Sequence, residues 1–208
     1  MFPVNLDLAR LPVALVGNGP MTERRLALLD EDRAAAVAVY APTPGETLLH
    51  RAGPRLRRRW PTTVEARRAR VLLIADGVEA CMAREMVAAA RASGTLVNVA
   101  DRPELCDFHS PATVRRGDLL LTVSTAGRAP ALSRRLSRFL AEVFGPDWQA
   151  RLDRLASLRA AWREGGARAA DIRDWSENWI QDQGFLPDSV KAAEALEETL
   201  RKTPLASA

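Results

Sequence analysis

An aspartate stands where a short, buried strand is expected to end. Residues 95–99 (TLVNV) are an apolar, β-branched run of the kind that forms a strand buried on both faces. The sequence Asp101-Arg102-Pro103 then forces the chain out of regular structure. Ligands of open α/β sheets collect at the carboxyl ends of the strands, so Asp101 is expected to be an acid placed where a substrate would lie. The alternative is an aspartate that only caps the turn at Pro103.

A glycine-rich turn near the amino terminus suggests a second kind of chemistry. Residues 17–22 (GNGPMT) follow a short apolar run and lead into a segment with helical spacing. Strand, glycine turn and helix form the context in which such a turn binds a dinucleotide: Gly17 permits the tight turn, and Gly19 lets the backbone approach a pyrophosphate. Thr22 replaces the usual Gly or Ala, and Pro20 removes one N–H. A turn that holds no cofactor is the alternative.

Four possible metal ligands follow Asp101 at a spacing that matches no closed tetrahedral site: Glu104, Cys106, Asp107 and His109. No metal site is therefore predicted, and Asp107 and His109 are only weak candidates for an open, transient one. Cys81 and Cys106 form no CxxC pair, which speaks against a disulfide framework and fits a reducing cytoplasm.

Two long linked patterns are NVADRPELCDFHSPA and VRRGDLLLTVSTAGRAPALSRRL. Together with the glycine turn, they resemble the precorrin-2 dehydrogenase family, the amino-terminal module of siroheme synthases, over about residues 2–145. The resemblance implies NAD-dependent oxidation of precorrin-2 to sirohydrochlorin, on the route to siroheme or cobalamin. It also implies that Asp101 carries the chemistry. Fe²⁺ would be needed only if the chain is a ferrochelatase as well.

The same resemblance assigns binding residues. Those expected at the cofactor are Gly17, Gly19, Pro20, Met21, Pro42 and Thr43. Those expected at the polycarboxylate substrate are Ser124, Thr125, Arg128 and Arg134, on a turn into an Arg-rich helix that suits carboxylates. Thr125 could instead only cap that helix. Residues 75–77 (ADG) stand where the family has Ala-Thr-Asp or similar, in a loop expected on the nicotinamide side.

The predicted fold is a Rossmann-like, doubly wound α/β domain over residues 1–111. A strand–helix dimerisation segment (112–145) and a helical carboxyl-terminal domain (146–208) are expected to follow it, and the chain is expected to form a homodimer. No apolar run approaches the ~20 residues of a membrane span. The net charge of +4 and the arginines suit a polyanionic small molecule, whereas no aromatic-interleaved basic motif indicates nucleic acid.

Two other functions remain open at this stage. One is a chelatase that acts on the same tetrapyrrole without NAD. The other is a non-catalytic sensor that binds a tetrapyrrole or a nucleotide.

Overall fold

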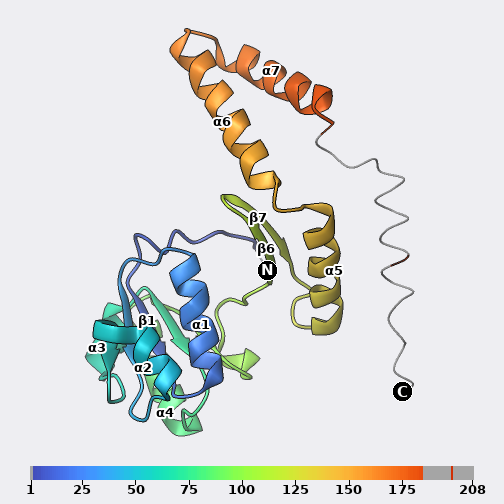
Figure 1. The fold of residues 1–208 in the computed structure, drawn as a ribbon. Coiled ribbons are helices and arrows are strands. Elements are labelled where there is room, and N and C mark those ends of the chain that lie inside the picture. Colours follow the sequence, from blue (N-terminus) through green and yellow to red (C-terminus); the bar gives the residue numbers. More distant parts are fainter. Residues whose placement is uncertain (1, 185–197, 199–208) are drawn as a thin grey trace. The chain divides into compact units, whose positions relative to one another are not determined.

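The computed structural model describes residues 2–184 and residue 198 (Figure 1). They form two compact units that divide between His109 and Ser110. The end of the helical domain predicted over residues 146–208 lies outside the described residues, at 185–197 and 199–208.

The first unit is built on a five-stranded sheet in which all paired strands are parallel. Its strands are β1 (Val13–Val16), β2 (Val37–Tyr40), β3 (Leu56–Arg57), β4 (Val71–Ile74) and β5 (Leu96–Val99), in the order β3-β2-β1-β4-β5. The short apolar runs VALV and VLLI are buried along their whole length, as expected of central strands covered on both faces.

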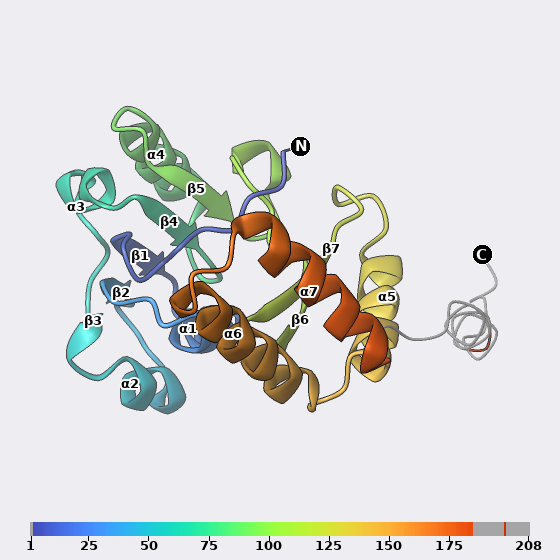
Figure 2. The ribbon, with the colours of Figure 1, turned by 90° about the horizontal axis from the view of Figure 1, so that it is seen from above.

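Helices cover both faces of this sheet (Figures 1 and 2). Helices α1 (Pro20–Glu31) and α2 (Glu46–Ala52) pack on one face, where Leu26, Leu29 and Leu48 join one core cluster. Helices α3 (Thr63–Arg68) and α4 (Ala80–Arg91) pack on the other face, where Ala66 and Met86 join a second cluster. This arrangement confirms the doubly wound α/β fold.

The second unit begins with an antiparallel hairpin of β6 (Ala112–Arg116) and β7 (Leu119–Val123). The expectation of a single strand before the helix is therefore wrong. Gly117, with φ +60°, and Asp118 make the two-residue turn that pairs the strands. Helix α5 (Pro130–Val143) packs on the hairpin, and the Arg116 guanidinium donates to the carbonyl oxygens of Ala141 (2.9 Å) and Phe144 (2.7 Å).

Two helices follow in the second unit, α6 (Trp148–Glu164) and α7 (Ala169–Asp182). They pack against each other, and the rings of Trp162 and Trp175 meet edge to face at a centroid distance of 5.5 Å. Within residues 2–184 and 198, no helix combines the length and apolar character needed to cross a membrane.

Candidate functional site

Three loops are tied together at the carboxyl edge of the parallel sheet. They follow β1, β2 and β4, whose last residues Val16, Tyr40 and Ile74 are in register. The Asn18 side-chain oxygen accepts the Thr43 N–H (3.0 Å), and the Asn18 N–H donates to the carbonyl oxygen of Asp76 (3.2 Å). The predicted cofactor residues of the first two loops are therefore neighbours, at the edge where ligands of this fold bind.

The carboxylate of Asp76 lies on the amino terminus of α1. Its Oδ1 accepts the N–H groups of Gly19 (3.1 Å) and Thr22 (3.2 Å) as well as the Thr22 hydroxyl (2.8 Å). Its Oδ2 accepts the N–H of Met21 (2.9 Å). An anion at this position is stabilised by both the free helix amides and the helix dipole.

The two glycines of the turn are required by this internal contact. A Cβ on Gly19 would clash with Oδ2 of Asp76 and lie 2.8 Å from its Cγ. Gly17 has φ +152°, and a Cβ there would clash with the Thr22 hydroxyl and lie 2.8 Å from the Asp76 carbonyl oxygen. The positions of Thr22 and Asp76 are thus enough to explain why both residues of the turn are glycines.

Asp76 is negatively charged at neutral pH. Burial alone would raise its pKa, but the hydrogen bonds from Met21 and Thr22 outweigh burial and hold the pKa below the ordinary carboxyl value. The N–H groups at the start of α1 and the Thr22 hydroxyl therefore form a site that suits a small oxyanion. In this conformation the carboxylate of Asp76 occupies that site. The N–H groups that a dinucleotide pyrophosphate would approach are engaged by Asp76 in this conformation.

Asp101 lies just beyond β5 at the same edge, with its side chain exposed. Its φ is +57°, a left-handed conformation that Asp tolerates better than most residues. The Cys106 sulfur holds the loop in place by contacts with the Val99 N–H (3.2 Å), the Val99 carbonyl oxygen (3.2 Å) and the Arg102 carbonyl oxygen (3.3 Å). Among the described residues, no hydrogen bond engages the Asp101 carboxylate, which leaves it available to a ligand.

Arg25 and Asn98 belong to this edge and were missed by the sequence analysis. The Arg25 guanidinium donates to the Asn98 side-chain oxygen (2.6 Å) and to the Ile74 carbonyl oxygen (3.2 Å). Burial lowers the pKa of Arg25, while the acidic groups of Cys106, Asp101 and Asp76 act in the opposite direction. One signal was readable in the sequence: Arg25 is three residues after Thr22 and one before Leu26, on the stripe of the helix that faces the sheet.

The two weak candidates for a metal ligand, Asp107 and His109, do not belong to a cluster of ligands. Asp107 pairs with Arg91 (2.8 Å) and accepts the Val97 N–H (2.9 Å), so its carboxylate fixes the loop after β5. His109 is exposed. Across residues 2–184 and 198, no cluster of three His, Cys, Asp or Glu side chains could hold a metal ion.

The predicted substrate residues lie in the second unit, on the turn between β7 and α5. The Thr125 hydroxyl accepts the Ala129 N–H (3.1 Å) and is 3.0 Å from the Ser133 hydroxyl. The Thr125 hydroxyl therefore orders the turn before α5, whose amino-terminal cap residue, Ala129, has no side-chain capping bond. Ser124, Arg128 and Arg134 are exposed.

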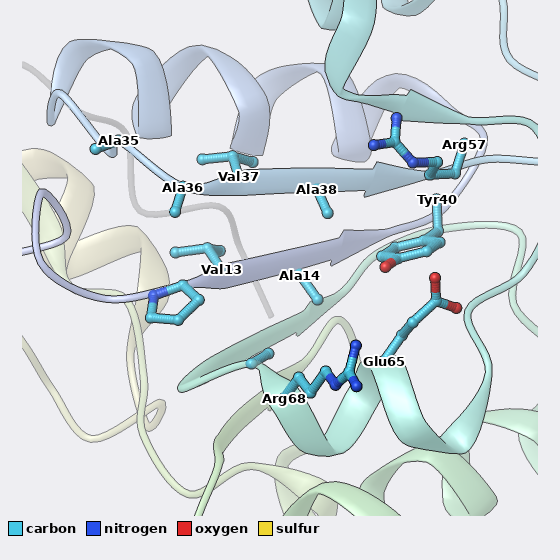
Figure 3. A pocket seen from close by; sticks show the side chains of 12 residues that line it. Val13, Ala14, Ala35, Ala36, Val37, Ala38, Tyr40, Arg57, Glu65 and Arg68 are labelled. Carbon is cyan, nitrogen blue, oxygen red and sulfur yellow. The ribbon is translucent and has the colours of Figure 1, made fainter.

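A cavity of about 440 Å³ lies elsewhere in the first unit, on the α3 side of β1 and β2 (Figure 3). Its wall is made of small residues such as Ala14, Ala36 and Ala38, and the Glu65 carboxylate points toward the Tyr40 ring. Glu65 is already paired with Arg59 (2.7 Å). The cavity includes none of the predicted site residues.

Comparisons with known proteins identify the family to which the first unit is similar. The sequence model of a family described as "Putative NAD(P)-binding" matches residues 4–112. Siroheme synthase of Methylococcus capsulatus is 37% identical over 165 residues, which cover 78% of this chain and 34% of that protein. Siroheme synthase of a Psychrobacter species is 28% identical over 213 residues, covering 97% of this chain and 42% of that protein. The chain thus spans between a third and a half of the length of these relatives.

A solved structure named "SirC, precorrin-2 dehydrogenase" has the same fold. It superposes with a TM-score of 0.72 at 22% sequence identity, over 97% of this chain and 100% of that one.

Proposed function

Because the chain belongs to the NAD(P)-binding family whose model matches residues 4–112, we propose that it oxidises precorrin-2 to sirohydrochlorin with NAD. The observation that carries the proposal is the exposed Asp101 carboxylate, which lies at the same carboxyl edge of the sheet as the glycine turn. The names of the relatives, siroheme synthase and precorrin-2 dehydrogenase, support this substrate.

The reaction removes a hydride and a proton from the tetrapyrrole. NAD, when bound, supplies the hydride acceptor. Asp101 accepts the proton at its carboxylate, and the exposure of this side chain lets it pass the proton on to water. Arg25, whose positive charge interacts with that of Asp101, is a compensating cation at the same edge of the sheet.

The substrate carries many carboxylates, and the second unit offers groups that suit them. We assign substrate binding to Arg128 and Arg134 together with the Ser124–Thr125 turn, where guanidinium groups flank the start of α5. We also assign homodimer formation to residues 112–145, because a hairpin covered by one helix leaves apolar surface such as Leu132, which is 43% exposed. Two unpaired cysteines, Cys81 and Cys106, agree with a reducing cytoplasm.

The test is anaerobic incubation of the purified chain with precorrin-2 and NAD. Sirohydrochlorin and NADH should appear together in the absorbance spectrum, in equal amounts. Sirohydrochlorin formation without NADH, or no oxidation at all, would refute the proposal.

Metal insertion into sirohydrochlorin without NAD is the second candidate. One observation favours it: the amide donors that a pyrophosphate needs are engaged by Asp76. Incubation with sirohydrochlorin and Fe²⁺ in the absence of NAD distinguishes the two functions, because only a chelatase accelerates the appearance of the metallated product.

A further inference from the structure

We infer that Asp76 competes from within the chain for the pyrophosphate site and thereby sets the cofactor affinity of this protein. The inference rests on the proposed NAD binding. It assigns to Asp76 a role that differs from ordinary loop packing: the carboxylate must leave the start of α1 before the dinucleotide can enter.

The first argument is that every amide donor of the turn is already used. Pro20 has no N–H, which leaves Gly19, Met21 and Thr22 to face an anion at the start of α1. All three donate to the Asp76 carboxylate, at 3.1, 2.9 and 3.2 Å. A pyrophosphate would need these same groups, because they are the donors that such a turn offers to phosphate.

The second argument is that two departures from the usual pattern are bonded partners. Thr22 stands where a dinucleotide-binding turn has Gly or Ala, and Asp76 stands in the loop after β4. The Thr22 hydroxyl donates to Asp76 Oδ1 at 2.8 Å, and the Thr22 side chain is fully buried. Thr22 thus adds a fourth donor that holds the carboxylate in place, which a Gly or Ala could not supply.

The third argument is electrostatic. A pyrophosphate brought to the start of α1 would meet the negative charge of Asp76 at contact distance, where like charges repel strongly. Binding therefore requires the conformation in which Asp76 has turned away, and the apparent affinity falls in proportion to the population of that conformation.

Three substitutions test this inference on the full chain. Asp76→Asn keeps the shape of the side chain and removes its charge. Asp76→Thr removes both the charge and the reach. Thr22→Val removes one hydrogen bond to Asp76 without changing any charge. Glu79→Gln is the matched control, because it removes a carboxylate from the same loop. The Glu79 carboxylate accepts a hydrogen bond from the Cys81 thiol (3.8 Å) and, among the described residues, makes no hydrogen bond to the start of α1.

The primary readout is the dissociation constant of NAD, measured by calorimetry without tetrapyrrole. Asp76→Asn and Asp76→Thr should bind NAD about tenfold more tightly than the parent, which corresponds to about 1.4 kcal/mol. Thr22→Val should tighten binding by a smaller factor, and Glu79→Gln should leave it unchanged. Inorganic pyrophosphate, titrated as a second probe, should follow the same order.

The second readout is the melting temperature without ligand. Both Asp76 variants should melt at a lower temperature than the parent, because α1 loses the negatively charged acceptor at its amino terminus. This loss shows that the carboxylate holds the helix in solution.

The outcomes separate the inference from the function on which it rests. If parent and Asp76 variants bind NAD equally well, the competition is refuted while NAD binding stands. If NAD binds to none of them, both are refuted. A gain in the Glu79→Gln control as large as that of Asp76→Asn would also refute the inference, because it would reflect net charge alone.

Discussion

Replacing Asp101 by asparagine tests the proposed proton transfer with the smallest structural change. Asp101 has φ +57°, and asparagine is the residue that shares with aspartate a tolerance of this conformation. Among the described residues its carboxylate makes no hydrogen bond that the amide would lose. The substitution therefore removes the base and leaves the turn after β5 as it is.

The expected loss of activity follows from the role of a general base. Oxidation of precorrin-2 by Asp101→Asn should fall by roughly 100-fold or more. The melting temperature and the dissociation constant of NAD should stay at the parent's values. Asp101→Ala should lose the same activity and in addition about 1 kcal/mol of stability, since alanine pays the cost of a left-handed conformation. That loss would lower the melting temperature by roughly 2–4 °C in a chain of this size.

The assay is the initial rate of NADH formation from precorrin-2 under anaerobic conditions, together with thermal unfolding of each variant. Glu104→Gln is the control, because it removes an exposed carboxylate three residues further along the same loop. Oxidation that survives Asp101→Asn at the parent's rate would show that Asp101 is only a turn residue. An equal loss in Glu104→Gln would show that the loop's charge, and not Asp101, is what matters.

Three further predictions concern stability and assembly. Asn98→Ala should lower the free energy of unfolding by about 2–3 kcal/mol in denaturant titrations, because the half-buried Arg25 guanidinium loses one of its acceptors and the Phe108 carbonyl oxygen loses its donor; an unchanged midpoint would contradict this account. The hydrogen bond from Arg59 to Glu65, with help from the Thr62 N–H, holds the pKa of Glu65 below its ordinary value of 4.5, so its stabilisation is present above about pH 4.5 and is lost as the pH falls further. Glu65→Gln should therefore flatten the decline of the unfolding free energy below that pH, and parallel curves for the two proteins would refute the linkage. The chain should sediment as a homodimer at micromolar concentration, and a stable monomer would rule out the interface assigned to residues 112–145.

The strands of the sheet could be predicted because each is a short apolar run bounded by turn residues. VALV, VLLI and LVNV are unambiguous in this respect, and the structure places a strand in each. The strand Ala112–Arg116 was missed because its sequence, ATVRR, ends in two arginines and buries only Val114. Its pairing with β7 depends on a partner strand and on the Gly117 turn, which local apolar content does not reveal.

The edge that carries the site could be predicted for a topological reason. Parallel strands end on the same side of the sheet, so residues that follow β1, β2 and β5 must lie at one edge of it. Asp101 was placed at this edge on those grounds, whereas Gly17 was predicted from the glycine pattern and Thr43 from the family resemblance. The hydrogen-bond partners of the side chains there could not be predicted, because Arg25 donates to Asn98, which is 73 positions away in the sequence.

The same limit explains why the glycine turn is ambiguous from sequence alone. Judged one at a time, Thr22 and Asp76 each look like the loss of a cofactor-binding feature. In the structure they are partners 54 positions apart in the sequence, and each explains the other. Gly17 and Gly19 are then needed to make room for Thr22 and Asp76, whether or not a phosphate ever occupies the turn. A glycine pattern between a strand and a helix therefore establishes a cradle for an anion, and only the side chains of the neighbouring loop decide whether that anion comes from a ligand or from the protein.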